Sequence, residues 1–170
     1  NSTLIVNSTE FRNNHAGRTA GAIIIALYSK ANVHNCIFAN NTSGNQIGGI
    51  QVQNKSMLSI SKSQFNNNHA DHYVGAVSIT YNSKGSMENC IFVNNTSGNQ
   101  TGGIEAQENS ILNISNSKFI NNFAGDSGGA ISVQIFANAS INNCSFINNT
   151  ATMGTGGIYV EANSAINVSN

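Results

Sequence analysis

One short box, Phe-x-Asn-Asn, recurs six times in this sequence at an unbroken interval of 27 residues. A fixed period of this length is the signature of a stacked repeat architecture, in which each repeat forms one supersecondary unit. The boxes begin at Phe11, Phe38, Phe65, Phe92, Phe119 and Phe146. The chain is therefore expected to fold as a stack of 27-residue coils.

Each repeat also shows the spacing of short β-strands. Apolar residues alternate with polar ones, as in Ile50 and Val52, Leu58 and Ile60, and the residues around each Phe. A glycine lies ten or eleven residues after each Phe, at Gly21, Gly49, Gly75, Gly103, Gly129 and Gly157. Asn, Ser, Gly and Lys separate the strands, and these residues favour tight turns. The pattern predicts three short strands per coil.

Three short strands cannot close a sheet by themselves, but equivalent strands of successive coils can pair in parallel at about 4.8 Å. The sequence therefore predicts an all-β fold, a three-sided parallel β-helix. A right-handed coil is expected from the strong bias of parallel crossovers. A solenoid of helical hairpins is the alternative, and the lack of any stretch with a 3.6-residue period disfavours it.

Stacking would place equivalent residues in columns, with the six Phe side chains inside the coil. The second Asn of each box falls at the following turn, and stacked amides can form a hydrogen-bonded ladder. The residues expected in this ladder are Asn14, Asn41, Asn68, Asn95, Asn122 and Asn149. Asn also tolerates the left-handed backbone that a sharp corner requires.

A longer period of 54 residues shows that the coils alternate. Cysteines recur at Cys36, Cys90 and Cys144, and Ser63 and Ser117 occupy the same position in the coils between them. Neighbouring cysteines would lie two coils apart, about 9.6 Å, whereas a disulfide needs Cα atoms within about 7 Å. We expect the three cysteines to be small buried side chains.

The same alternation affects the Asn box. Every second box continues with Thr to give Asn-Asn-Thr, and Asn-x-Ser/Thr is the acceptor pattern for N-linked sugar. A glycan is far wider than one coil, so a sequon on every second coil gives each sugar more room. Asn40, Asn94 and Asn148 are the first candidates for glycosylation, with Asn41, Asn95 and Asn149 kept for the ladder.

The sequence holds thirteen such triplets, about twice the number that its composition alone would give. The further candidate acceptors are Asn7, Asn54, Asn99, Asn113, Asn138 and Asn167. An Asn-rich chain that carries unused triplets is the alternative. Covalent N-linked glycans are the one added group that the sequence predicts, and no cofactor is expected.

Both ends of the chain fall in mid-coil, because residues 1–8 align with residues 163–170 three 54-residue units later. Solenoids usually carry atypical polar repeats as caps. We therefore expect residues 1–170 to be a single uncapped segment of a longer solenoid or filament. Its expected partners are further coils or copies of itself, stacked end to end.

Composition limits the other classes of partner that this chain can bind. Seven basic and seven acidic side chains give zero formal net charge, whereas nucleic acids are bound through clustered Lys and Arg. The longest apolar run, 20–27, is too short to cross a bilayer. The sequence therefore predicts no nucleic-acid partner and no membrane insertion by this segment.

Many β-helices act on polysaccharides, and such sites use clustered carboxylates. Here Asp71 and Asp126 would lie two coils apart, while Glu105 and Glu108 share one coil and Glu161 matches neither in position. No catalytic residues are predicted. A polysaccharide-acting enzyme remains the less favoured alternative.

Metal binding would need several ligands around one ion. His15 and His69 share a column two coils apart, with His72 nearby. Turn or surface positions explain these histidines more simply, so no metal site is predicted.

Taken together, Phe-x-x-Asn and Gly-Gly-Ala-Ile resemble the repeats of chlamydial polymorphic membrane proteins. Phe-x-x-Asn occurs in all six coils, whereas the full Gly-Gly-Ala-Ile occurs once, at 128–131. The resemblance implies a β-helical adhesin passenger that contacts a host or matrix surface. The excess of sequons departs from a bacterial adhesin and favours a eukaryotic secretory route.

These observations predict a non-catalytic structural protein, an extracellular or cell-surface β-helical rod with glycans as its coat. The alternative is an adhesin passenger whose binding tip lies outside the sequence. The flanking gene sequence would distinguish the two.

Overall fold

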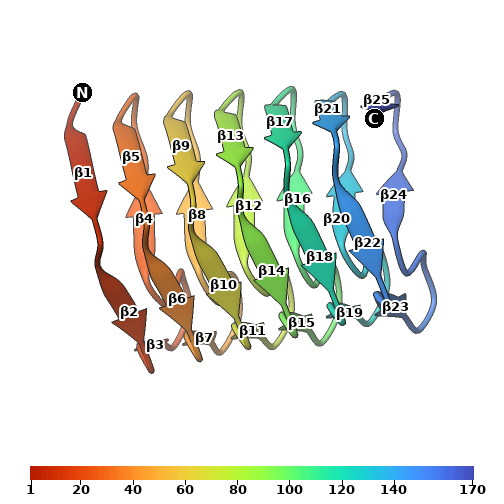
Figure 1. The fold of residues 1–170 in the computed structure, drawn as a ribbon, viewed down its shortest axis with the longest axis horizontal. Helices are drawn as coiled ribbons and strands as arrows, with labels where there is room; N and C mark the ends of the chain where they lie inside the picture. The colour runs from red at the N-terminus through yellow and green to blue at the C-terminus, as the bar shows by residue number, and fades with distance from the viewer.

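The computed structural model describes residues 1–170 as 25 short strands in four parallel sheets, without a helix. The coils follow one another along the long axis of the molecule (Figure 1). The predicted all-β parallel β-helix with 27-residue coils is therefore confirmed.

The four sheets are numbered in the order in which the chain first enters them. The first contains β1 (Thr3–Asn7), β5 (Lys30–His34), β9 (Met57–Ser61), β13 (Lys84–Glu88), β17 (Ile111–Ser115), β21 (Asn138–Asn142) and β25 (Ala165–Ser169). The second contains β2 (Glu10–Arg12), β6 (Ile37–Ala39), β10 (Gln64–Asn66), β14 (Ile91–Val93), β18 (Lys118–Ile120) and β22 (Ser145–Ile147). The third contains β3 (His15–Ala16), β7 (Thr42–Ser43), β11 (His69–Ala70), β15 (Thr96–Ser97), β19 (Phe123–Ala124) and β23 (Thr150–Ala151). The fourth contains β4 (Ile23–Ile25), β8 (Ile50–Val52), β12 (Val77–Ile79), β16 (Ile104–Ala106), β20 (Ile131–Val133) and β24 (Ile158–Val160).

Each coil thus has four strands, and the prediction of three was wrong. The missed strands are those of the third sheet, which have only two residues each. Two residues are too few for an alternating pattern to appear in a sequence. In Figure 1 the first and second sheets run one after the other down the same side of the coil. The third sheet crosses below them, and the fourth returns up the opposite side.

Strand pairing preserves the sequence period without a slip. Every paired residue faces its equivalent 27 positions later, as in Phe38 with Phe65 and Ile50 with Val77. Because a slip of one residue would turn every inward side chain outward, the buried columns fix this register.

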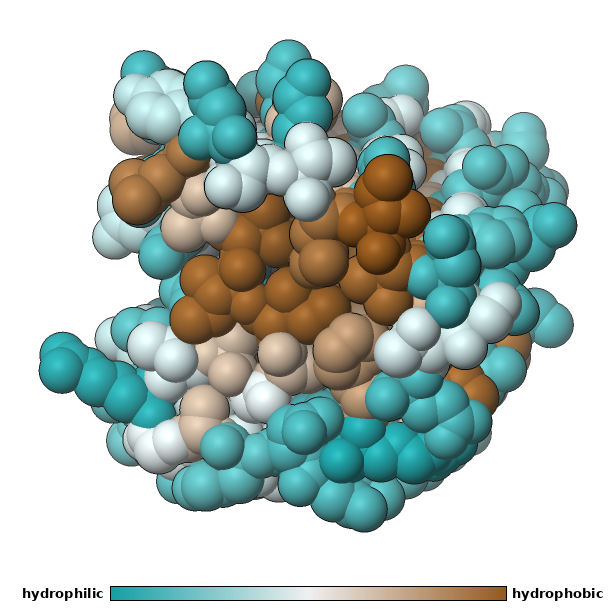
Figure 2. All heavy atoms as spheres, turned by 90° about the vertical axis from the view of Figure 1, so that its left-hand side faces the viewer, coloured by the Kyte–Doolittle hydropathy of each residue, from teal (hydrophilic) through white to brown (hydrophobic).

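The core is a set of columns of like side chains. The six Phe rings stack face over face with centroids 4.7–5.2 Å apart and planes within 8° of parallel. Phe38, Phe65, Phe92 and Phe119 are completely buried, whereas Phe11 and Phe146 in the end coils are partly exposed. Seen from the N-terminal end, apolar side chains gather in the middle of the end face within a polar rim (Figure 2).

Non-glycine residues supply the left-handed corners. Twenty-four of them have positive φ, and they fall in three turns that repeat in every coil. The first Asn of each Phe-x-Asn-Asn box occupies one of these turns, with φ between 52° and 55°. Another turn places two consecutive residues in this conformation, as in Tyr81 and Asn82.

The glycines serve close packing instead, because none of them has positive φ. One column is glycine in every coil: Gly21, Gly48, Gly75, Gly102, Gly129 and Gly156. The predicted glycine set was wrong in alternate coils, because Gly49, Gly103 and Gly157 belong to the next column. In that column they alternate with alanines. A Cβ on Gly75 would overlap the carbonyl oxygen of Gly102 in the next coil.

Candidate functional site

The second Asn of each box forms the ladder that the sequence predicts. Asn95 is completely buried, and its Nδ2 donates to the Phe65 carbonyl oxygen at 2.9 Å and to Asn122 Oδ1 at 3.0 Å. Its own Oδ1 accepts hydrogen bonds from the backbone N–H and the side chain of Asn68, at 3.0 and 2.9 Å. All the hydrogen-bonding capacity of this buried amide is therefore used.

The ladder runs in one direction, because each side-chain amide from Asn14 to Asn122 donates to the asparagine of the following coil. Asn149, the last member, donates to the Phe119 carbonyl oxygen. A buried amide without partners would destabilise the fold by about 1–3 kcal/mol. The ladder therefore both satisfies the buried amides and favours Asn at every position of the column, because an apolar residue there would remove hydrogen bonds from its two neighbours.

The first Asn of each box faces the opposite way. Asn40, Asn94 and Asn148 are exposed, and their left-handed backbone turns the side chain away from the core. Asn40 Nδ2 makes one exposed hydrogen bond, to Asn13 Oδ1 at 3.2 Å. Two adjacent asparagines thus divide the corner into a buried ladder and a solvent-facing column.

The other candidate acceptors lie on several faces. Asn7, Asn99, Asn113, Asn138 and Asn167 are exposed, and Asn54 is half-buried in a turn. The triplets that begin at Asn41 and Asn95 differ, because these side chains are buried and hydrogen-bonded in the ladder. In the folded coil their amides are inaccessible to a sugar.

The 54-residue period also has a hydrogen-bonding role. His15 Nδ1 lies 2.9 Å from Thr42 Oγ1, and His69 Nδ1 lies 2.7 Å from Thr96 Oγ1. Alternation of His and Thr therefore pairs neighbouring coils as well as creating sequons. His15 and His69 lie in the two-residue strands β3 and β11 rather than in turns. No group of three or more His, Cys, Asp or Glu is placed to hold a metal ion.

The cysteine column alternates for a similar reason. The backbone N–H groups of Cys36 and Cys90 each donate to the serine hydroxyl of the next coil at 3.0 Å. Both thiols are buried, Cys144 is half-buried, and all three are free. Burial raises the pKa of Cys90 to about 11, which keeps this side chain a neutral thiol at physiological pH.

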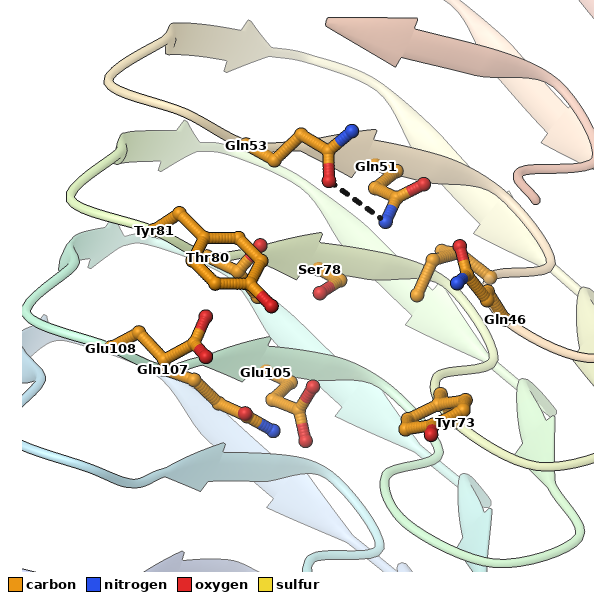
Figure 3. Close-up of a pocket in the computed structure, with 11 residues that line it drawn as sticks. Gln46, Gln51, Gln53, Tyr73, Ser78, Thr80, Tyr81, Glu105, Gln107 and Glu108 are labelled. Carbon is orange, nitrogen blue, oxygen red and sulfur yellow. Dashed lines mark hydrogen bonds between the residues drawn. The ribbon is translucent and has the colours of Figure 1, made fainter. Parts of the chain in front are cut away.

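A groove that the sequence did not predict lies on the outer face of the fourth sheet, over β8, β12 and β16. It has a volume of about 220 Å³, and eight of its eleven lining residues are polar. Gln51, Ser78 and Glu105 lie along its floor, one from each strand, with Tyr81 on one side and Tyr73 on the other (Figure 3). Tyr81 belongs to a left-handed turn, and Tyr73 to the loop before β12.

Glu105 is the unusual residue of this groove. It is 2% exposed, and burial raises its pKa to about 7 against smaller opposing effects of Gln107 and Thr101. Its one hydrogen bond, from Thr101 Oγ1, is long at 3.5 Å. The same hydroxyl lies 2.9 Å from Ser132 Oγ. A hydroxyl has one proton to donate, so the Glu105 carboxyl is left poorly partnered.

Sequence reasoning missed this groove because its residues share no repeated type. The outward position of the fourth sheet reads Ile24, Gln51, Ser78, Glu105, Ser132 and Tyr159 along the coils. The available signal was a carboxylate at a strand centre, between two apolar inward residues.

Neither the comparison with curated proteins nor that with solved structures gives a match. No helix of the structure is long and apolar enough to cross a membrane. A family model described as "Right handed beta helix region" matches residues 1–170. Since this match covers the whole repeat array, the chain belongs to the right-handed β-helix family.

Proposed function

We propose that this β-helix is a non-catalytic scaffold, an extracellular rod that carries N-linked glycans on alternate coils. The observation that carries the proposal is the divided corner of the Asn box. Asn40, Asn94 and Asn148 face solvent, while the ladder residues beside them are buried. Sugars on the first residue would leave the hydrogen bonds of the second untouched.

The spacing of these three residues supports the same interpretation. Neighbouring acceptors are two coils apart, about 9.6 Å along the axis at the strand spacing of a parallel sheet. The intervening boxes present Asn67 and Asn121 at this corner, each followed two residues later by a residue that completes no sequon. A glycan on every second coil would form one row along the rod.

Secretion from eukaryotic cells followed by glycopeptide mass spectrometry tests this proposal. We expect occupancy at Asn40, Asn94 and Asn148, and its loss at Asn94 alone in a Thr96→Ala variant. A Thr101→Ala variant, which disrupts the triplet at Asn99 instead, should keep Asn94 occupied. Finding all three corner residues unmodified in a secreted, folded protein would refute the proposed coat.

We further propose that coils or copies of this chain stack end to end. In the first coil, Leu4 occupies an inward column yet is 39% exposed. The ladder also ends there at Asn14, whose Oδ1 receives no hydrogen bond from another amide. A coil in the same orientation, from the same polypeptide or another copy, would cover Leu4 and donate a hydrogen bond to Asn14 Oδ1.

An adhesin passenger related to chlamydial polymorphic membrane proteins is the second candidate. The polar groove on the fourth sheet favours it, since a rod alone has no need of a concave surface with a poorly partnered buried carboxyl. Flanking gene sequence that encodes a membrane barrel or anchor would support the adhesin. Further 54-residue units in a filament-forming protein would support the rod.

A polysaccharide-acting enzyme is the least favoured candidate. Glycoside hydrolysis ordinarily uses two carboxyl groups that face one bound sugar. The neighbours of Glu105 in its column are Ser78 and Ser132, and Glu108 belongs to the adjoining turn. Absence of cleavage when the protein is incubated with neutral and acidic polysaccharides would support the non-catalytic scaffold.

A further inference from the structure

We infer that the groove on the fourth sheet binds an uncharged saccharide, with one sugar unit seated between Tyr73 and Tyr81 over the floor of Ser78 and Glu105. This inference goes beyond the scaffold proposal and does not depend on glycosylation. It would supply the adhesin alternative with a binding site within the rod.

The charge of the lining determines the ligand class. Glu105 and Glu108 are the two ionisable acids of the groove, and none of the eleven lining residues is Lys, Arg or His. Anionic ligands such as phosphates or uronates are held by clustered cationic side chains, so this lining would repel them. An uncharged ligand meets no such barrier.

The polar groups of the floor suit hydroxyl groups. Gln46, Gln51, Gln53 and Gln107 each offer both a donor and an acceptor, and Ser78 and Thr80 add hydroxyls. Gln51 and Gln53 interact with each other only weakly, through a single 3.5 Å hydrogen bond. Ligand hydroxyls both donate and accept hydrogen bonds, so they can pair with either the donors or the acceptors of this surface.

The groove also leaves one buried polar group poorly partnered. The Glu105 carboxyl is almost fully buried with one long hydrogen bond. Outside the eleven lining residues, Gln100 Oε1 and Gln134 Nε2 are also buried and make no hydrogen bond. Gln100 precedes Thr101, and Gln134 follows Gln107 in its column. Because buried polar groups are ordinarily paired, a polar ligand seated over Glu105 would give its carboxyl a further partner.

The two tyrosines supply the apolar part of the site. Both rings are about half exposed, at 43% for Tyr73 and 50% for Tyr81, and they flank the floor on opposite sides (Figure 3). An aromatic ring offers an apolar face together with a polar hydroxyl, which matches the C–H face and the hydroxyl rim of a sugar ring.

Size and position argue against two other ligand classes, an enclosed drug-sized molecule and a peptide that extends the sheet. The volume of about 220 Å³ is smaller than the roughly 300–1,000 Å³ of sites that enclose drug-sized molecules, which suits one unit of an open-ended chain. A peptide that extends a sheet needs a free strand edge, whereas this groove lies on the face of paired strands.

The experiment uses the full 170-residue chain made in bacteria, so that its own glycosylation is absent. The labelled protein is applied to an array of neutral and acidic oligosaccharides, and the strongest neutral binder is then titrated by calorimetry. We expect binding to neutral oligosaccharides, weakened about tenfold or more by Tyr81→Ala and by Tyr73→Ala. The control is Tyr28→Ala, which removes an exposed tyrosine of another left-handed turn outside the groove and should leave affinity unchanged.

Three outcomes would overturn the inference: no oligosaccharide binds, only acidic oligosaccharides bind, or the Tyr73→Ala/Tyr81→Ala double variant binds as well as the parent. Circular dichroism of each variant checks that the coil remains folded. Glycosylation in secreted protein is scored separately, so either proposal can fail while the other stands. Cleavage of the bound oligosaccharide would support the groove and contradict the non-catalytic scaffold.

Discussion

At the scale of single residues, adjacent side chains in this fold have opposite roles. Asn94 and Asn95 have the same chemistry and neighbouring positions, yet one is exposed and the other is fully buried in the ladder. The difference comes from the backbone, because the first Asn takes the left-handed turn. The effect of replacing an asparagine should therefore depend strongly on which of the two is replaced.

Asn95→Ala should lower the free energy of unfolding by about 3 kcal/mol or more, since it removes four buried hydrogen bonds. These join the Asn95 side chain to the Phe65 carbonyl oxygen, to the Asn122 side chain, and to the backbone N–H and side chain of Asn68. The matched control Asn94→Ala should lower it by about 1 kcal/mol, the usual cost of a left-handed alanine. Urea unfolding followed by circular dichroism measures both. Equal losses in the two variants would contradict the ladder's energetic role.

Glu105 should make stability depend on pH in an unusual direction. Its pKa is raised to about 7 in the folded chain from an ordinary 4.5, so the folded state holds this proton more tightly than the unfolded state. Stability is therefore fully present below pH 4.5 and is lost as the pH rises through 7, by about 3 kcal/mol at most. Glu108 nearby adds to the effect, since its charge further raises the pKa of Glu105.

A Glu105→Gln variant isolates the contribution of this carboxyl, because the amide has a similar shape and does not titrate. Parent and variant should be compared in urea at pH 5 and pH 8. We expect the parent to lose more stability than the variant between the two values. If the difference in unfolding free energy between parent and variant is the same at pH 5 and pH 8, Glu105 does not titrate in this range.

At the scale of elements, repeated features were predictable from the sequence and unique ones were not. The Phe column and the Asn ladder follow from identical residues at equal spacing. The third sheet was not predicted because its strands are only two residues long. The groove was not predicted because Gln51, Ser78 and Glu105 occupy the same position in successive coils but are different residue types. The all-glycine column was also predicted incorrectly, although the 27-residue interval aligns Gly48, and not the adjacent Gly49, with Gly75.

Gly75→Ala tests how tightly neighbouring coils pack at the all-glycine column. The added Cβ would overlap the Gly102 carbonyl oxygen and lie 2.7 Å from the Thr96 nitrogen. Because both are backbone atoms, we expect a loss of about 3 kcal/mol or more in unfolding free energy. Gly17→Ala is the control, since a Cβ there meets no atom within 4 Å and should change stability by less than about 0.5 kcal/mol. The thermal midpoints should differ accordingly, and similar midpoints would indicate that the coils can spread apart.

At the scale of the whole molecule, each coil contacts only its neighbours, so the side chains of the interior columns are exposed at the two ends. Leu4 is inward yet 39% exposed, and Val168 is inward yet 57% exposed. The end-to-end stacking proposed above would cover these surfaces, and head-to-tail contact of this kind yields open filaments when it does not close into a ring.

Leu4→Lys should therefore reduce self-association of the 170-residue chain. The neighbouring Ile5→Lys is the control, because Ile5 is 65% exposed and lies at the alternate, outward position of β1. Sedimentation velocity over a range of concentrations should show elongated oligomers for the parent and the control, and mainly monomer for Leu4→Lys. A parent that stays monomeric at the highest concentration would contradict end-to-end stacking.

The unbroken register described above has a mechanical consequence. When the two ends of the chain are pulled apart, tension reaches a terminal coil first, and the remaining coils stay paired until that coil has detached. Each coil that yields would release its 27 residues, about 90 Å of extended chain. Because the coils are alike in length and pairing, the rod would lengthen in equal steps, so that load is relieved coil by coil while the rest of the rod keeps its shape.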